Sequence, residues 1–362
     1  MTEYFKRTIS IAGRRVGVGG RCFIIADPGS NHNGSLESAL ELVDLAAFAG
    51  VDAVKFQTFR AEEHYSRRTP QFAYLRRMDP TVSTFEMIKR NELPRDWHAV
   101  LKSRAESQGM IFLSTPSDRS AVDELVDRHQ MAAVKIASFE AIDLPWIEYC
   151  ARKSRPMIIS TGMCSLEEIE DVLETMRQAG NQELILLHCV SLYPTRPDQV
   201  NLRAMQKMGA KFPVPIGLSD HTPGIAVPIA AAALGACVIE KHYTVDRRLP
   251  GPDHFFALEP AELKSMVTGI REAELALGMD IKGPLPEEEE MSRLGRRSIV
   301  ARTRISEGTR ITAEMLTTKR PGYGIRPKFL TQVIGQVPRR SIEEDEVITW
   351  EMLTHNGSES QI

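Results

Sequence analysis

The sequence predicts an α/β protein, a (β/α)8 TIM barrel followed by a small, mainly β C-terminal domain. Eight short runs rich in Val, Ile and Phe alternate with helical patterns, and eight such repeats close a parallel barrel. Most of these runs become polar at their C-terminal ends, where the active sites of barrels lie. The chain has 362 residues, so an ordinary barrel leaves a remainder for a second, smaller unit.

The candidate strands are short apolar runs bounded by turn residues or helical patterns. Residues 35–50 lie between two of them, carry apolar side chains at three- and four-residue spacing and end on a glycine, as an amphipathic helix does. Residues 165–180 begin as a capping box, which indicates the start of another helix. In chain order the strands span residues 22–27, 53–58, 111–116, 133–138, 156–161, 183–189, 214–220 and 237–244.

Composition and charge favour a small-molecule partner and a cytoplasmic protein. The formal net charge is −3 and the Lys and Arg residues are dispersed, which gives no footprint for nucleic acid or a membrane surface. No apolar run approaches the roughly 18 to 20 residues of a membrane span, and "MTEYFKRTIS" lacks the apolar stretch of a signal peptide. Wide spacing predicts reduced, mostly buried thiols at Cys22, Cys150, Cys164, Cys189 and Cys237.

Polar side chains at the strand ends converge on one rim of the predicted barrel. A buried strand has no packing reason to finish on charged or hydroxyl groups, so their convergence indicates a site. In chain order the ends carry Asp27, Lys55, Gln57, Ser114, Thr115, Lys135, Ser138, Ser160, Thr161, His188, Asp220, His221, Glu240, Lys241 and His242.

Two histidines predict a metal site on this rim. His221 and His242 end the seventh and eighth strands, which are neighbours in a closed barrel, so their imidazoles can face one cavity. The carboxylate of Asp253, just past the eighth strand, lies within reach of the same rim. The pattern favours a divalent cation that keeps open coordination positions.

Two lysines predict an anion site beside that metal. Lys55 and Lys135 end the second and fourth strands, and with the hydroxyls of Ser138 and Ser160 they suit a compact, multiply charged anion such as a phosphate ester. The sequence has no P-loop and no GxGxxG motif. We therefore expect a metal, a phosphorylated anion and a polyhydroxylated partner in one site.

Several long motifs, in order along nearly the whole chain, resemble the sialic acid (N-acetylneuraminate) synthase family. These enzymes condense phosphoenolpyruvate with an N-acylated hexosamine, such as N-acetylmannosamine or a relative, to give a nine-carbon 2-keto acid and phosphate. The resemblance implies a divalent cation, Mn²⁺ in first place with Mg²⁺ or Co²⁺ as alternatives. It rests on "NHNGSLESALELVDLAAFAGVDAVKFQTF", "FLSTPSD", "VKIASFEAIDLPWIEYCARKSRPMIISTGM", "GLSDHT", "IEKHYT", "GPDH" and "RRSIVA...KRPGYGI".

The resemblance also implies a role for each matching residue. His221 and His242 match the metal-binding pair, and Ser191 stands where some relatives have asparagine. The implied catalytic residues are Asp27, Lys55, Lys135, His221, His242 and Asp253. The implied phosphoenolpyruvate contacts are Lys55, Thr115, Lys135, Ser138, Ser160, Ser191 and Ser219, and the implied sugar contacts are Gln57, Tyr193, Asp253 and Arg320.

The end of the chain looks like the family's antifreeze-like (SAF) domain. We expect a barrel over 1–283, a linker over 284–293, the SAF domain over 294–355 with short strands in "RSIVART" and "EVITWEML", and a disordered tail over 356–362. A unit of about 60 residues buries little core by itself, so it should dock on a barrel. The resemblance implies a homodimer in which this domain covers the partner's barrel and supplies Arg320.

Two departures from the family pattern leave the acceptor sugar open. "ADPGSNHNG" places Asp27 and Pro28 where glutamate and isoleucine are usual, and Tyr323 stands where a smaller or amide residue is common. Aspartate is one methylene shorter, and a displacement of about 1 Å can cost a catalytic group a hundredfold in rate. An acceptor of the legionaminic or pseudaminic type, or another unusual sugar, is therefore an alternative to N-acetylmannosamine.

Two other classes of protein compete with the synthase. A metal-dependent hydrolase would use the histidines and Asp253, but it usually needs more ligands and has no use for paired lysines. A non-catalytic sugar-binding protein would use the small domain as an adhesive surface. A related barrel enzyme that makes a shorter keto sugar from a phosphorylated aldose lacks a SAF domain.

Overall fold

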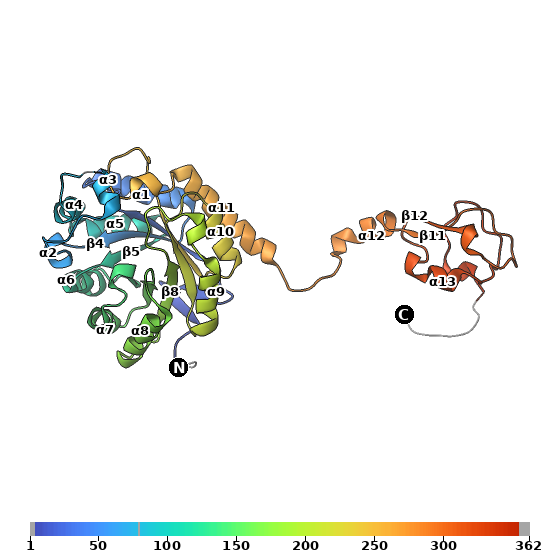
Figure 1. The fold of residues 1–362 in the computed structure, drawn as a ribbon, viewed down its shortest axis with the longest axis horizontal. Coiled ribbons are helices and arrows are strands. Elements are labelled where there is room, and N and C mark those ends of the chain that lie inside the picture. The colour runs from blue at the N-terminus through green and yellow to red at the C-terminus, as the bar shows by residue number, and fades with distance from the viewer. Residues whose placement is uncertain (1–3, 79, 355–362) are drawn as a thin grey trace. The chain divides into compact units, whose positions relative to one another are not determined.

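The computed structural model describes residues 4–78 and 80–354, in which the chain divides into two compact units (Figure 1). The units are Met1–Gly278 and Met279–Ile362. The predicted boundary at residue 283 stays a proposal, and residues 289–293 of the predicted linker belong to helix α12 (Glu289–Gly295). The tail predicted to be disordered, 356–362, lies outside the described residues.

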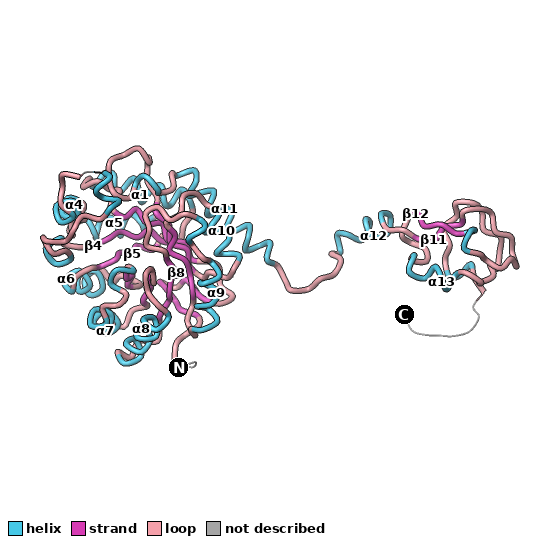
Figure 2. The backbone as a smooth tube through the Cα atoms, in the orientation of Figure 1, coloured by secondary structure: helices cyan, strands magenta, loops and turns pink. Residues whose placement is uncertain are grey.

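Eight parallel strands form the sheet of the first unit, as the sequence predicts. Their order is β5-β4-β3-β10-β9-β8-β7-β6, and the end strands β5 and β6 contact each other, so the sheet nearly closes into a barrel. Figure 2 shows these strands inside a shell of helices. The strands are β3 (Phe23–Gly29), β4 (Ala53–Thr58), β5 (Ile111–Pro116), β6 (Val134–Ile136), β7 (Met157–Ser160), β8 (Leu184–Cys189), β9 (Ile216–Asp220) and β10 (Val238–His242).

Helices follow the strands along the chain, and both predicted helices are present. Ser35 caps α1, which ends at Gly50 in the left-handed region with φ of 82°. Ser165 and Glu168 form the capping box of α8. The helices of this unit are α1 (Leu36–Ala49), α2 (Ala61–His64), α3 (Ala73–Met78), α4 (Thr84–Arg90), α5 (Trp97–Ser107), α6 (Arg119–Asp123), the π-helix η1 (Glu124–Arg128), α7 (Leu144–Ala151), α8 (Leu166–Gln178), α9 (Leu202–Lys211), α10 (Ala226–Ala233) and α11 (Pro260–Leu277).

Strand β3 contains a break in register at the unusual Asp27-Pro28 pair. Its pairing with β4 shifts between Ala26 and Gly29. Proline has no N–H for a sheet ladder, so inside a sheet it needs a bulge or an edge. Here the bulge accommodates Pro28, and the carbonyl of Pro28 accepts from the N–H of Asn31 at 2.8 Å. The strand therefore turns out of the sheet at the residue that carries the Asp27 carboxylate.

A hairpin that the sequence analysis did not predict precedes the barrel. Strands β1 (Thr8–Ile11) and β2 (Arg14–Gly17) pair antiparallel, and their apolar side chains join the barrel core. Arg14 on β2 pairs with Asp52, the residue just before β4. The hairpin thus packs at the N-terminal ends of the strands, opposite the predicted site.

The second unit has its own small core and little regular structure. Strands β11 (Ser298–Ala301) and β12 (Leu316–Lys319) pair antiparallel, with short helices α12 (Glu289–Gly295) and α13 (Leu330–Val333). The expected strand in 346–353 is wrong, because that segment makes only isolated bridges, at Val347 and at Leu353, with a 3-10 turn, Trp350–Met352, between them. Across the described part of the chain, no helix combines the length and apolar character that crossing a bilayer requires.

Candidate active site

The polar strand ends meet in one pocket at the C-terminal end of the barrel, here called the rim pocket. Among its lining residues are most of the side chains that the sequence analysis selected: Asp27, Lys55, Gln57, Thr115, Lys135, Ser138, Ser160, Tyr193, Ser219, His221, His242 and Asp253. Ser191 lies beside it, with its Oγ near Gly162 next to Ser138. Arg320 belongs to the second unit, so its role at a barrel rim stays a prediction.

Lys55 is buried in the rim pocket between two carboxylates. Its Nζ donates to Asp27 Oδ2 at 2.7 Å and to Thr115 Oγ1 at 3.2 Å, and lies 3.9 Å from Glu240 Oε2. Burial by itself would lower the pKa of Lys55, but Asp27 and Glu240 outweigh it and raise that pKa. Lys55 is therefore a permanent positive charge inside the barrel.

Lys135 is the second buried ammonium group, and its charge is less fully matched. Its Nζ donates to Ser160 Oγ at 2.8 Å and to the carbonyl of Ile136 at 2.7 Å, and lies 3.6 Å from Glu240 Oε1. Burial lowers the pKa of Lys135 in spite of the Glu240 carboxylate. One carboxylate, Glu240, is thus shared by both lysines, whereas Asp27 pairs with Lys55.

The two predicted metal ligands face each other across neighbouring strands. The rings of His221 and His242 have centroids 5.5 Å apart. His221 Nδ1 donates to the carbonyl of Val190 at 3.0 Å, which leaves Nε2 as the metal-binding nitrogen. His242 Nε2 lies 3.5 Å from Asp27 Oδ2, and its buried Nδ1 has no hydrogen-bond partner among the described residues. This donor set fits a divalent cation.

The protonation of the two histidines differs because their neighbours differ. Burial opposes the charged form of His221, but negative charge on the adjacent Cys189 sulfur, together with the Val190 carbonyl, outweighs it and raises the pKa of His221 to about 9. Burial dominates at His242 and lowers its pKa, despite the attraction of Asp27. Binding of a cation therefore displaces a proton from His221 and meets an already neutral imidazole at His242.

Asp27 lies in the bulge of β3, and Asp253, on the loop after β10, packs against the residues that follow that bulge. Burial would raise the pKa of Asp27, but Lys55 and His242 outweigh it and lower that pKa. Asp253 Oδ2 accepts from both the N–H and the Oγ of Ser30, at 3.2 and 3.0 Å. Gly29, with φ of +54°, makes this approach possible, because a Cβ there would lie 2.5 Å from Asp253 Oδ2. The shorter Asp27 side chain still reaches Lys55.

Hydroxyl and aromatic groups complete the pocket. Ser138 Oγ accepts from the N–H of Gly162 at 2.9 Å, and Ser219 Oγ donates to Glu240 Oε1 at 3.2 Å. The ring of Tyr193 packs on His221 with centroids 4.5 Å apart. The buried Ser191 Oγ lacks a hydrogen-bond partner within the described structure, as expected of a group that meets a substrate.

The rim pocket has further lining residues that the sequence analysis did not predict. Glu140 lines it, with Oε1 3.7 Å from His64 Nε2, and its Oε2 has no partner in the part of the chain that the structure describes. An apolar wall lies on the same side, made by Phe59, Leu75, Met87 and Ile88 from the segment between β4 and α5. Glu240 was noted as a strand-end residue but received no role. Glu140 and the apolar wall were missed because the sequence analysis searched the ends of the strands, whereas these residues lie on loops and short helices.

Comparison with known proteins identifies the family of the chain. Residues 42–282 match the NeuB family and residues 296–354 match the SAF domain. The chain belongs to the NeuB family. The family assignment confirms the resemblance on which the sequence analysis relied.

Relatives cover almost the whole of this NeuB-family chain. It is 42% identical to the N,N'-diacetyllegionaminic acid synthase of Legionella pneumophila, over 91% of this chain and 94% of the relative. It is 39% identical to the N,N'-diacetyllegionaminic acid synthase of Campylobacter jejuni, over 91% and 99%. A crystal structure of N-acetylneuraminic acid synthetase from Leptospira borgpetersenii, in complex with citrate, superposes with a TM-score of 0.70 at 33% identity, over 80% of this chain and 96% of that chain. The chain is thus similar to named synthases, and it is an enzyme.

A buried ion pair behind the rim pocket joins the two histidine strands. Lys241 Nζ donates to Asp220 Oδ2 at 2.5 Å, and the side chains of both residues are 1% exposed. Asp220 also accepts from the N–H and Oγ1 of Thr222 at 3.0 and 2.9 Å. Each partner is the neighbour in sequence of a histidine, so the pair fixes the backbone that carries His221 and His242.

We expect Lys241→Met to lower the free energy of unfolding by about 3–5 kcal/mol, because it leaves the Asp220 carboxylate buried and unpaired. Asp220→Asn in the Lys241→Met background should recover part of that loss. Lys153→Met is the matched control, since Lys153 pairs with the surface residues Asp123 and Asp127 and should cost about 1 kcal/mol or less. Urea denaturation measures all three variants, and equal losses in Lys241→Met and Lys153→Met would contradict the argument.

Glu140 predicts a pH dependence of stability. Burial raises the pKa of Glu140 to about 7, against the attraction of Lys135. The folded state therefore holds a proton that the unfolded state releases near pH 4.5, and the resulting stability is lost as pH rises through 7. Between pH 5 and 8 the stability of the wild type should fall by roughly 2 to 3 kcal/mol relative to Glu140→Gln. Parallel pH profiles of the two proteins in thermal denaturation would refute this.

Proposed function

We propose that this chain is a transferase that condenses phosphoenolpyruvate with an N-acylated hexosamine, giving a nine-carbon 2-keto acid and phosphate. The observation that carries the proposal is the pair of buried ammonium groups, Lys55 and Lys135, in the same pocket as His221 and His242. A phosphate ester that also bears a carboxylate offers one anionic group to each lysine. A hydrolase would gain nothing from this second, buried cation.

The reaction forms one carbon–carbon bond and one carbon–oxygen bond to water, and it breaks the carbon–oxygen bond to phosphate. C3 of phosphoenolpyruvate adds to the aldehyde carbon of the open-chain sugar, water adds at C2 and gives up a proton while the aldehyde oxygen takes one up, and phosphate leaves from C2. The lysines hold the carboxylate and phosphate throughout, with hydroxyl groups of Thr115, Ser138 and Ser160 beside them. Asp27 lies between Lys55 and His242, and its carboxylate opposes the positive charge of Lys55.

His221 and His242 are the residues that would hold a divalent cation, with Mn²⁺ favoured and Mg²⁺ or Co²⁺ as alternatives. When bound, such a cation supplies a Lewis acid for the negative charge that develops on the aldehyde oxygen. Asp253 and Gln57 line the pocket on the side proposed for the sugar, together with Tyr193. Their polar groups suit the hydroxyl and amide groups of an amino sugar.

The acceptor end favours a sugar with two acylated amines. Two relatives that share about 40% identity, from Legionella pneumophila and Campylobacter jejuni, are named for a product with two N-acetyl groups. The apolar wall of Phe59, Leu75, Met87 and Ile88 offers a surface for the methyl groups of such a substrate. We therefore propose a 2,4-diacetamido hexose ahead of N-acetylmannosamine.

We expect phosphate release only when phosphoenolpyruvate, a divalent cation and an acceptor sugar are all present. A 2,4-diacetamido hexose should give a higher kcat/KM than N-acetylmannosamine, and chelation should abolish turnover until a cation is restored. Lys135→Met should lower kcat/KM for phosphoenolpyruvate roughly 100-fold or more, because it removes a buried charge-assisted contact. Phosphate release from phosphoenolpyruvate without a sugar, or full activity of Lys135→Met, would overturn the proposal.

We further propose that the enzyme works in the cytoplasm as a homodimer whose SAF domain covers the partner's barrel. The loop "KRPGYGI" presents Arg320, whose Nε donates to the carbonyl of Gly295 at 2.8 Å and whose side chain is exposed. A fixed guanidinium suits the acyl oxygen of the sugar. The small core of the second unit supports docking on a larger partner.

Subunit mixing tests the shared site. Lys135→Met disables the barrel and Arg320→Ala disables the SAF contribution, so each protein alone should be inactive. After subunit exchange, mixed dimers contain an intact barrel facing an intact SAF domain, and part of the activity should return. If each chain builds its site alone, mixing restores nothing.

A further inference from the structure

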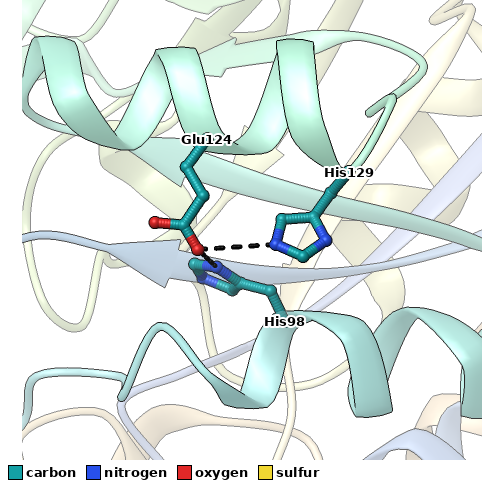
Figure 3. A group of neighbouring side chains, drawn as sticks. All are labelled: His98, Glu124 and His129. Atoms are coloured by element: carbon teal, nitrogen blue, oxygen red, sulfur yellow. Dashed lines mark hydrogen bonds and ion pairs between the residues drawn. The ribbon is translucent and has the colours of Figure 1, made fainter.

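Three side chains outside the rim pocket converge between two helices on the outside of the barrel (Figure 3). His98 lies at the start of α5, Glu124 begins the π-helix η1, and His129 follows it. His98 Nδ1 and His129 Nε2 lie 3.3 and 3.4 Å from the same oxygen, Glu124 Oε1, and all three atoms lie within 4.8 Å of one another. We call this group the outer cluster.

The π-helix is what brings two members of the outer cluster together. In an α-helix, side chains five residues apart point about 140° away from each other. Here the N–H of His129 donates to the carbonyl of Glu124 at 3.0 Å, an i→i+5 bond that widens the turn. Glu124 and His129 therefore point to the same face, toward His98 on α5 (Figure 3). Such π turns often occur at functional sites.

A chain of hydroxyl groups anchors one nitrogen of His98. Thr58 Oγ1 lies 2.9 Å from His98 Nε2 and 2.7 Å from Ser114 Oγ, which in turn lies 3.2 Å from the carbonyl oxygen of Phe56. Because Nε2 is held by Thr58, Nδ1 is the nitrogen that faces Glu124 Oε1.

The contacts of Glu124 Oε1 with His98 Nδ1 and with His129 Nε2 are longer than an ordinary hydrogen bond between nitrogen and oxygen, and they fit a shared metal ion. A tetrahedral Zn²⁺ with bonds of about 2.0–2.1 Å places its ligand atoms roughly 3.3–3.4 Å apart. Two of the separations in the outer cluster have these values.

We propose that the outer cluster is a zinc site with His98, Glu124 and His129 as ligands and a fourth position open to water. The side chains of Glu124 and His129 are 19% and 12% exposed, which gives the ion an entry path. Thr58 orients His98, as an outer hydrogen-bond partner orients many metal-binding histidines. Arg95 lies 3.7 Å from the other carboxylate oxygen, Glu124 Oε2, and leaves Oε1 available.

The proposed zinc ion would have a structural role, since its site is linked to the rim pocket only through residues next to those that line the pocket. Thr58 and Ser114 are the neighbours in sequence of Gln57 and Thr115, which line the pocket. A zinc ion would tie α5 and η1 to the ends of β4 and β5. The proposal does not rest on the proposed reaction, because none of the three ligands lines the rim pocket.

The test uses full-length protein carrying His221→Ala and His242→Ala, so that the rim histidines cannot bind metal. Equilibrium dialysis with Zn²⁺ should give one ion per chain, and Co²⁺ should show the intense visible absorption of a tetrahedral site. Zn²⁺ should also raise Tm by several degrees, because the ion binds only the folded state. No binding in this background would overturn the proposal.

Two further variants assign the ligands. His129→Asn and Glu124→Gln, each added to that background, should weaken Zn²⁺ binding at least 100-fold and remove the rise in Tm. His64→Asn is the matched control, a histidine outside both the outer cluster and the rim pair, and should leave binding unchanged. Circular dichroism verifies that each variant is folded, and Glu124→Gln keeps nearly the same shape should His129→Asn fail to fold. Unchanged affinity in the folded ligand variants would refute the site.

Discussion

The need to pair two ammonium groups inside the barrel governs the arrangement of the rim pocket. Lys55 and Lys135 are each 2% exposed, and a buried charge without a partner costs several kcal/mol. Asp27 meets Lys55 directly, and Glu240 lies within 4 Å of both lysines. This balance leaves room for an anion while keeping the empty barrel stable. It also explains why strand β10 ends on charged residues rather than on more apolar ones.

The barrel could be predicted from the sequence because its strands are continuous apolar runs with polar ends. Two predicted ranges, 53–58 and 111–116, coincide with β4 and β5, since both strands are buried on both faces. The second unit was harder to predict. "EVITWEML" has the composition of a strand, yet it makes only isolated bridges, at Val347 and at Leu353. Between them Ile348 is buried in a small core and Trp350 starts a turn. Tertiary packing overrides β-propensity there.

The parts of the outer cluster and of the rim pocket that the sequence did not predict depend on contacts between distant segments. His98 and Glu124 are 26 residues apart, and only an irregular π turn brings His129 to them. No periodic pattern in the sequence marks such a turn. Glu140 follows a predicted strand, but the burial that raises its pKa comes from the loops around it. The bulge at Pro28 could be suspected from the missing N–H, whereas its effect on Gly29 and Asp253 required the structure.

The rim pocket separates a part that the barrel fixes from a part that can vary. The lysines and histidines extend from strands whose backbones are tied into the sheet, so their geometry cannot change without disturbing the whole barrel. The apolar wall and Tyr65 come from short helices and loops between β4 and α5, which lie outside the sheet and vary more readily. For the reaction that we propose, the strand ends would hold the phosphorylated substrate, and the choice of acceptor sugar would depend mainly on the apolar wall of Phe59, Leu75, Met87 and Ile88.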